Sequence, residues 1–243
     1  MTVAPDHVEE AMERIRAHVV RSPLISSPAL TRITGSAISL KLEAVQPTGS
    51  FKLRGAASKI LSMSEEDLAR GVVTASTGNH GRAVAHMAGE LGVSGVVCVS
   101  DKVPLGKGRG LEAAGCEVRI VGDSQDEAMV AARHLVDSEG MTLVHPFDDA
   151  HVIAGQGTIG LEILDKLPEV SHVLVPLSGG GLISGIATVM KERSPECEVI
   201  GVSMVDGAAM AASIQAGEPV EMPEQPTLAD SLQGGIGQDN QLT

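Results

Sequence analysis

Val72-Val73-Thr74-Ala75-Ser76-Thr77-Gly78-Asn79-His80-Gly81 is the stretch from which the fold can be inferred. Small and β-branched residues indicate a buried strand over Val72–Ala75. A turn of small and polar residues comes next, and then an alanine-rich stretch of helical period over Asn79–Leu91. A strand, a tight turn and a helix in this order are typical of a βαβ unit.

The same alternation continues on both sides of this unit. β-branched runs predict further strands over Ala37–Leu42, Gly95–Ser100, Glu117–Val121, His172–Val175 and Glu198–Ser203. Helical spacing of apolar residues predicts further helices over Asp6–Val20, Asp126–Ser138, Val152–Leu167 and Leu182–Glu192. We therefore expect an α/β fold of mostly parallel, twisted sheets with helices on both faces, and a ligand site at the carboxyl ends of the strands.

Composition narrows the class of protein. The 243 residues are 43% hydrophobic and 20% charged, as in an ordinary globular protein, and the formal net charge of -13 argues against nucleic acid or an anionic membrane as a partner. Met1–Arg21 has no signal-peptide core, and no apolar run is long enough to span a bilayer. Three scattered cysteines predict neither a disulfide scaffold nor a metal site, and favour a cytoplasmic location.

A lysine stands at the start of a predicted helix in Pro47-Thr48-Gly49-Ser50-Phe51-Lys52-Leu53-Arg54-Gly55-Ala56. Ser50 is predicted to cap this helix, which continues to Ile60. The helix dipole disfavours an ammonium in the first turn, so we expect a lowered pKa for Lys52 and an amine that forms an imine readily. The alternative is a solvated lysine at a helix start.

Two loops are candidate anion sites. Leu177-Ser178-Gly179-Gly180-Gly181-Leu182 lies between a strand and a helix, and its glycines let the backbone wrap around a phosphate. Its spacing matches neither the P-loop nor the dinucleotide fingerprint, so we expect a phosphate of mononucleotide size; the alternative is a flexible βα loop.

The turn Ser76–Gly81 could bind a carboxylate through backbone N–H groups, with the Asn79 amide available to a phenolic oxygen. His80 is either a catalytic base or a helix-start residue that matters through its backbone. The alternative for the whole turn is a plain βα connection capped by Ser and Thr.

Four segments together resemble fold-type II pyridoxal-phosphate (PLP) enzymes, which share a tryptophan synthase β-like fold. The likeness is to the threonine/serine dehydratase and serine racemase branch, and it covers nearly the whole chain. The segments are Ser50–Gly55, Ser76–Gly81, Ala154-Gly155-Gln156-Gly157-Thr158 and Ser178–Leu182. Cysteine synthase relatives fit less well, because they usually have Asp-Arg after the lysine where this chain has Leu53-Arg54. The resemblance implies a PLP-dependent lyase that eliminates the β-hydroxyl of a hydroxy amino acid and yields a keto acid and ammonia.

The resemblance also implies roles for single residues. Lys52 would hold the cofactor and later move the Cα proton, beside Phe51 packed against the ring and Asn79 bonded to the phenolic oxygen. The phosphate would lie in the backbone of Ser178, Gly179, Gly180, Gly181 and Leu182. The substrate carboxylate would be bound by Ser76, Thr77, Gly78, Asn79 and His80. Thr77 stands where racemases of the family have a catalytic serine, so a racemase is an alternative, and Ser203 at a family metal position implies no metal.

The same resemblance implies the domain organisation and assembly. A large PLP-binding domain would combine residues 1–70 and 149–243, a small domain of residues 71–148 would be inserted into it, and the protein would be a homodimer. Thr227–Gly237 resembles the hydroxyectoine-utilisation dehydratases, which implies a hydroxylated diamino-acid derivative as substrate. We expect the family's C-terminal portion to be missing after Thr243, so a truncated, non-catalytic PLP-binding fragment is a further alternative.

Overall fold

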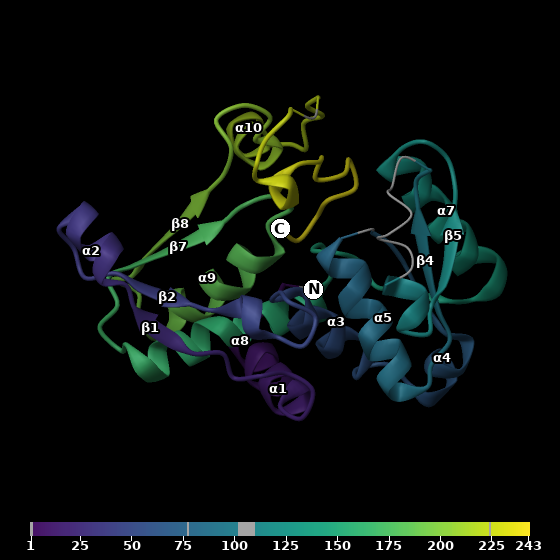
Figure 1. The fold of residues 1–243 in the computed structure, drawn as a ribbon, viewed down its shortest axis with the longest axis horizontal. Helices are drawn as coiled ribbons and strands as arrows, with labels where there is room; N and C mark the ends of the chain where they lie inside the picture. The colour runs from purple at the N-terminus through teal and green to yellow at the C-terminus, as the bar shows by residue number, and fades with distance from the viewer. Residues whose placement is uncertain (1, 77, 102–109, 224) are drawn as a thin grey trace.

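Parallel strands form the framework of the protein, as its computed structural model shows (Figure 1). The structure describes residues 2–76, 78–101, 110–223 and 225–243. A four-stranded sheet has the order β5-β4-β3-β6 and is parallel throughout, with a separate parallel pair β7-β8 and an antiparallel pair β1-β2. The strands are β1 Leu24–Ser26, β2 Ser39–Lys41, β3 Val72–Ala75, β4 Gly95–Val99, β5 Glu117–Ile120, β6 Thr142–Leu143, β7 His172–Pro176 and β8 Glu198–Val202.

Helices alternate with these strands along the chain. The α-helices are α1 Pro5–Ile15, α2 Pro28–Thr34, α3 Lys52–Ile60, α4 Glu65–Arg70, α5 Asn79–Leu91, α7 Gln125–Glu139, α8 Ala150–Lys166, α9 Gly181–Arg193 and α10 Ala209–Ala216. Two short 3₁₀ helices are η1 Glu43–Val45 and η2 Asp230–Leu232. Among the described residues, no helix is both long and apolar enough to cross a membrane.

Alternating residues of β3 and β4 enter two different cores, because successive side chains of a strand point to opposite faces. Val72 and Val97 pack with α3 and α5, whereas Val73 and Val96 pack with α7. The predicted helices on both faces are therefore confirmed for the four-stranded sheet. The β7-β8 pair differs: α9 covers one of its faces, while Leu174 on β7 remains 64% exposed.

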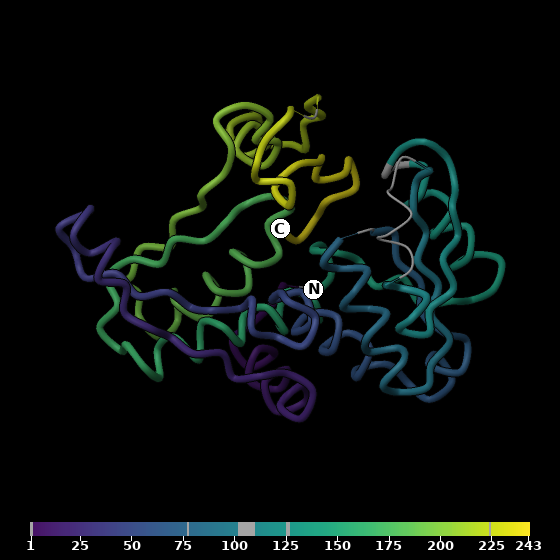
Figure 2. Tube along the Cα trace, in the orientation of Figure 1, coloured from purple at the N-terminus to yellow at the C-terminus, as the bar shows by residue number. Residues whose placement is uncertain are grey.

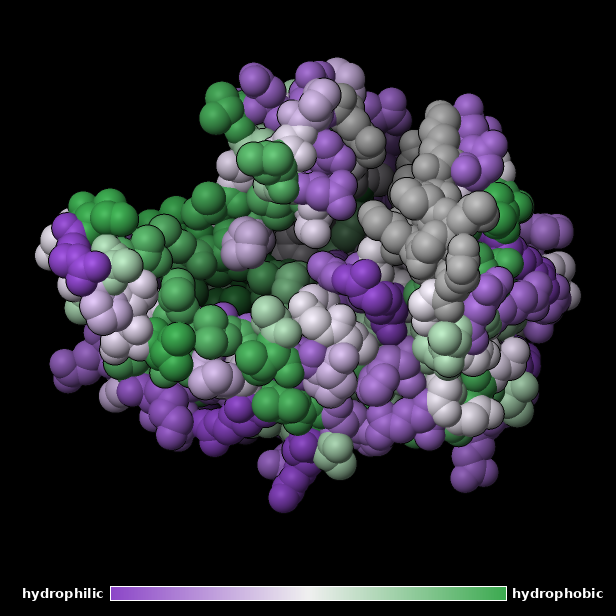
Figure 3. All heavy atoms as spheres, viewed as in Figure 1, coloured by the Kyte–Doolittle hydropathy of each residue, from purple (hydrophilic) through white to green (hydrophobic). Residues whose placement is uncertain are grey.

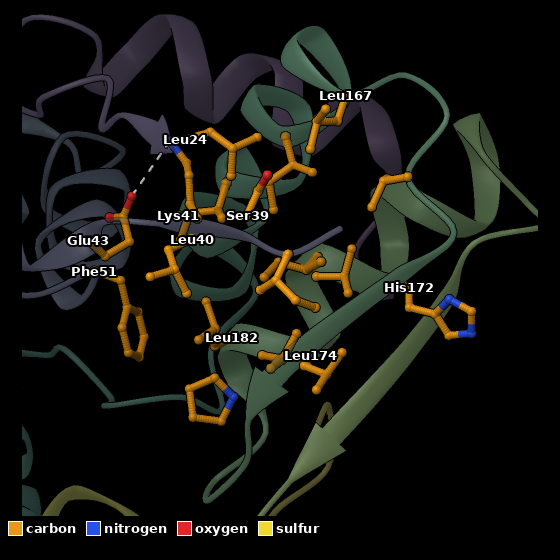
Figure 4. A pocket seen from close by; sticks show the side chains of 18 of the residues that line it. Leu24, Ser39, Leu40, Lys41, Glu43, Phe51, Leu167, His172, Leu174 and Leu182 are labelled. Atoms are coloured by element: carbon orange, nitrogen blue, oxygen red, sulfur yellow. Dashed lines mark ion pairs between the residues drawn. The ribbon is translucent and has the colours of Figure 1, made fainter. Parts of the chain in front are cut away.

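An apolar groove lies between the β1-β2 pair and the β7-β8 pair, with a cavity volume of about 460 Å³. Hydrophobic side chains gather around this hollow in Figure 3. Figure 4 shows Leu40, Phe51, Leu174 and Leu182 among the side chains that line it, with the Lys41–Glu43 ion pair at one end. Both strand pairs thus present apolar side chains to the same space.

Glycines allow the central helix α8 to approach its neighbours closely. A Cβ atom built on Gly155 would lie 2.4 Å from the carbonyl oxygen of Arg54 on α3. One built on Gly157 would lie 2.9 Å from the carbonyl oxygen of Gly185 on α9. The resemblance segment 154–158 therefore contributes by joining α3, α8 and α9 into one packed layer beneath the candidate site.

Several predicted boundaries were wrong. The helix predicted over Asp6–Val20 ends at Ile15, because Val19 reaches the same core from a turn rather than from a helix. The predicted strand Ala37–Leu42 is only β2, and it pairs antiparallel with β1, which the sequence pattern did not indicate. Neither α2 nor α10 was predicted, although Ser27 caps α2 by accepting the Leu30 N–H at 3.4 Å.

Candidate functional site

Lys52 is the first residue of α3, close to the predicted helix start. The cap was predicted wrongly: the N-cap residue is Phe51, and no side chain caps the helix. The Ser50 hydroxyl is buried and has no hydrogen-bond partner among the described residues. The Leu53 and Arg54 N–H groups at the start of α3 donate to the Ser50 and Phe51 carbonyl oxygens, so the unpartnered Ser50 hydroxyl is the polar group left near the lysine.

The Lys52 side chain folds inward rather than into solvent. Its Nζ donates a hydrogen bond to the Pro146 carbonyl oxygen at 2.5 Å and lies 5.5 Å from the centre of the Phe51 ring. Burial lowers the pKa of Lys52 from its ordinary value of 10.5 to about 8. The predicted direction of the shift is thus found, but desolvation causes it instead of the helix dipole.

The turn after β3 leads directly into α5, whose N-cap residue is Gly78 and which has no side-chain cap. The Ser76 carbonyl oxygen approaches Gly81 so closely that a Cβ atom there would lie 2.1 Å from it. Asn79 Oδ1 accepts a hydrogen bond from the Arg82 guanidinium. Thr77 lies outside the described residues. No side chain caps the start of α5, so its N–H groups are available to an anion, and the carboxylate site stays a prediction.

His80 is buried at the start of α5, and its Nε2–H donates to the Val144 carbonyl oxygen at 2.8 Å. Burial, with a contribution from the positive charge of Lys52, lowers the pKa of His80 to about 3. The imidazole is therefore neutral, and this contact favours a structural link to the end of β6 over a role as catalytic base. His80 and Lys52 contact carbonyls that are two positions apart in the chain, Val144 and Pro146, so the lysine and the 76–81 turn lie close together.

The glycine loop, Leu177–Gly180, connects β7 to α9, and no side chain caps α9. Gly180 has φ +87°, in the region that favours glycine, and a Cβ atom there would lie 2.7 Å from Met210 Cε and 2.8 Å from Thr243 Cβ. Gly179 lies against the Phe147 ring, where a Cβ atom would be 2.2 Å from Cδ1. The half-buried Ser178 precedes these glycines, and Leu182 packs in the apolar cluster that includes Phe51.

Replacing Gly180 with alanine is expected to destabilise this loop. The left-handed conformation costs an alanine about 1–2 kcal/mol, and the close contacts add about 1–3 kcal/mol of overpacking. Gly35→Ala is the matched control, because Gly35 has φ +76° but no atom within 4 Å of its Cβ position. Denaturant unfolding of both variants measures the difference, and equal losses in the two would contradict the packing argument.

Residues 144–148 join these three segments, and they were not among the predicted site residues. Val144 accepts from His80, the Pro146 carbonyl accepts from Lys52, and the Phe147 ring lies on the glycine loop. The His145 Nδ1 atom accepts the N–H of Asp148 at 2.8 Å, which tightens the turn. A signal was present in the run His-Pro-Phe-Asp after a short strand, since loop residues of this kind often carry function.

The donor set fits a phosphate-bearing aldehyde. An amine with a lowered pKa is able to condense with an aldehyde, and the uncapped start of α9 offers N–H groups to a phosphate. The uncapped start of α5 offers a second anion site for a carboxylate. Residues 144–148 place the amine and the two helix starts around one centre.

Comparisons with known proteins agree with this chemistry. Residues 15–242 match the family described as pyridoxal-phosphate dependent enzyme. A Sinorhizobium fredii protein with the provisional name threonine dehydratase is 52% identical over 98% of this chain, which spans 72% of that protein. An L-threonine ammonia-lyase of Thermotoga maritima is 44% identical over 93% of the chain, which spans 57% of it. Maize serine racemase is similar in structure, with a TM-score of 0.93, 32% identity, and coverage of 99% of this chain and 73% of that one.

Proposed function

Because the chain belongs to the family of pyridoxal-phosphate dependent enzymes, we propose that it is an ammonia-lyase acting on a β-hydroxy amino acid. The reaction removes the β-hydroxyl and the Cα hydrogen, and hydrolysis of the product then gives a keto acid and ammonia. The observation that carries this proposal is the partly buried amine of Lys52 at the centre of two uncapped helix starts. Similarity to proteins named threonine dehydratase and L-threonine ammonia-lyase supports the same reaction.

Each part of the site has a task in this proposal. The backbone N–H groups of Ser178–Leu182 bind the phosphate, and those at Ser76–His80 bind the substrate carboxylate. Phe51 would pack beside the cofactor ring, and Asn79, whose Oδ1 accepts from Arg82 here, would bond the phenolic oxygen. Lys52 Nζ would hold the cofactor and take the proton from Cα, and this proton would leave with the β-hydroxyl as water. PLP, when bound, supplies an electron sink for the pair left at Cα.

The direct test is a product assay. The purified chain with added PLP is expected to release ammonia and keto acid from threonine or serine. Release would exclude the alternative of a non-catalytic PLP-binding fragment. A chain that binds PLP but releases no ammonia from either amino acid, or from hydroxylated diamino-acid derivatives, would contradict the proposed reaction.

Racemisation is a second candidate, favoured by the likeness to maize serine racemase. It requires a second acid–base group opposite Lys52, for which Thr77 would be the candidate. Chiral analysis of the amino acid recovered from the assay distinguishes the two reactions. Inverted substrate without keto acid would favour the racemase, and keto acid without inversion would favour the lyase.

The rate at which apoprotein takes up PLP is expected to rise with pH through a midpoint of about 8, which is the lowered pKa of Lys52. The sign is set by the attacking species: the neutral amine condenses with an aldehyde, and its fraction increases as pH rises through the pKa. Stopped-flow absorbance after mixing apoprotein and PLP measures the rate. A rise that begins only near pH 10, the range of an ordinary lysine, would contradict a lowered pKa.

Four finer proposals accompany this function. The likeness of Thr227–Gly237 to hydroxyectoine-utilisation dehydratases suggests a hydroxylated diamino-acid substrate. Residues 1–70 with 149–243 would form the large domain, and residues 71–148 the small one. We propose a homodimer by analogy with the family, and a cytoplasmic location because all three cysteines are free thiols. Sedimentation analysis of the purified protein tests the dimer.

A further inference from the structure

Asp148 makes an unusual set of contacts with the last residues of the chain. Its carboxylate accepts three consecutive backbone N–H groups: Gln241 N–H to Oδ2 at 2.9 Å, and the N–H groups of Leu242 and Thr243 to Oδ1 at 2.8 and 3.1 Å. Successive backbone N–H groups that converge on one anion form a nest. The bonds cross 93 to 95 positions of sequence, so they join two distant parts of the chain.

The segment held in this way lies against the glycine loop. Thr243 Cβ would be 2.8 Å from a Cβ atom on Gly180, so the Thr243 side chain packs on the Gly180 backbone. Asn240 Nδ2 donates to Thr243 Oγ1 at 2.7 Å and orients that side chain. Ile236 is buried with Leu177 and Met210, which fixes the other end of the segment. In Figure 2 the end of the chain lies in the middle of the molecule, beside the start of α9.

A single turn of backbone therefore connects the lysine, the loop and the chain end. Lys52 donates to the Pro146 carbonyl, Phe147 packs on Gly179, and Asp148 holds residues 241–243. Any shift of the 240–243 segment would alter the packing against Gly180, because interiors at this density transmit displacement. Asp148 has no comparable bond to the loop itself in the described residues, so its effect on the loop passes through Thr243.

We propose that Asp148 is a positioning residue for the phosphate site: its carboxylate fastens residues 241–243, and this holds Thr243 against Gly180. The inference rests on the proposed function, because it takes the glycine loop to be the site of the PLP phosphate. It adds a residue outside the loop whose carboxylate supports the loop through Thr243. Asp148 contacts neither substrate nor cofactor in this role.

The test compares the apoprotein of wild type, Asp148→Ala and Asp148→Asn by equilibrium dialysis with PLP and with pyridoxal, which lacks the phosphate. Asp148→Ala is expected to bind PLP about tenfold more weakly, a loss that corresponds to about one net hydrogen bond. Its affinity for pyridoxal is expected to equal that of wild type. Asp148→Asn keeps one acceptor oxygen, which can retain the bonds to Leu242 and Thr243, so its loss should be smaller.

Amide hydrogen exchange provides a readout that needs no cofactor. Exchange at residues 241–243 is expected to be faster in Asp148→Ala than in wild type. Asp149→Ala is the matched control, because Asp149 caps α8 through the His151 and Val152 N–H groups and pairs with Lys59 at 2.8 Å. That variant should be less thermally stable than wild type while binding PLP with unchanged affinity.

The outcomes separate the inference from the function on which it rests. Equal PLP affinity in wild type and both Asp148 variants would overturn the positioning role alone. Equal weakening towards PLP and pyridoxal would overturn it as well, because it would indicate a general structural defect. Absence of PLP binding by the wild-type protein would overturn the proposed function and this inference together. If Asp148→Ala does not fold, Asp148→Asn decides by the same ratio of PLP to pyridoxal affinity.

Discussion

Replacing Lys52 with alanine is expected to abolish covalent attachment of PLP and to lower kcat/KM by about 1,000-fold or more, since a positioned acid–base group alone contributes about 100- to 10,000-fold. The amine of Lys52 is the group placed to condense with the cofactor aldehyde, and its pKa of about 8 leaves about a tenth of it neutral at pH 7, against less than about a thousandth for an ordinary lysine. The measurements are the visible absorbance band of lysine-bound PLP and the rate of keto-acid formation. Both should be lost together.

Lys59→Ala is the control for this prediction. Lys59 lies on the same helix α3, two turns after Lys52, and pairs with Asp149 at 2.8 Å instead of with the Pro146 carbonyl. The variant should therefore keep the absorbance band and most of the activity. An unchanged band in Lys52→Ala, or its loss in Lys59→Ala, would remove Lys52 from the role.

The alternation of strands and helices was predictable because each βα unit carries its own local signal. Val72–Ala75 was predicted with the bounds that β3 has, and Asn79–Leu91 with the bounds of α5. A short, buried β-branched run favours a strand, while small turn residues and alanine-rich helical spacing indicate the turn and the helix after it. Membership of the PLP-dependent family confirmed the resemblance drawn from the four sequence segments quoted above.

The distant contacts made by residues 144–148 were not predictable from local pattern. Its importance comes from carbonyl oxygens and a carboxylate that meet Lys52, His80 and residues 241–243 from distant parts of the chain. Backbone acceptors have no sequence signature, because every residue has a carbonyl group. The predicted Ser50 cap of α3 was wrong for a related reason. Serine is a good cap by propensity, but tertiary packing buries the Ser50 hydroxyl instead.

The arginine two positions after Lys52 has a structural role that was not predicted. Arg54 is fully buried, and it donates to Glu43 on η1 and to Glu162 on α8. The N–O distances lie between 2.7 and 2.9 Å, and Thr158 Oγ1 accepts a further bond at 3.0 Å. A charge within apolar helices is a usable signal, because it needs a partner of opposite charge when buried. Glu162, between Leu161 and Ile163, is that partner.

Arg54→Met is expected to lower the free energy of unfolding by about 3–5 kcal/mol, the usual cost of removing one partner from a buried ion pair. Methionine is apolar and flexible enough to fit the space, but it leaves Glu43 and Glu162 with only Lys41 as a cationic partner among the described residues. Denaturant unfolding at neutral pH measures the loss. Arg21→Ala is the control: its pair with Asp165 is 2.7 Å long, yet both side chains are more than half exposed, so the loss should be about 0–1 kcal/mol.

The pH dependence of the free energy of unfolding provides a second, independent test of this prediction. Burial alone would raise the pKa of Glu43, but the hydrogen bonds and charge of Arg54, together with smaller contributions from Ser22 and Lys41, outweigh it and hold that pKa below its ordinary value. A carboxyl with a lowered pKa stabilises the folded protein above its unfolded-state pKa, and this contribution is lost as pH falls through the folded-state value. Without Arg54 the burial remains, so Glu43 in Arg54→Met should have a raised pKa and be protonated more readily. The stability gap between wild type and Arg54→Met should therefore narrow as the pH is lowered, starting above the ordinary Glu43 pKa of 4.5, where the variant takes up a proton, and ending below it, where wild type does. A gap that stays constant or widens in acid would show that lost packing, and not an unpaired carboxylate, accounts for the destabilisation.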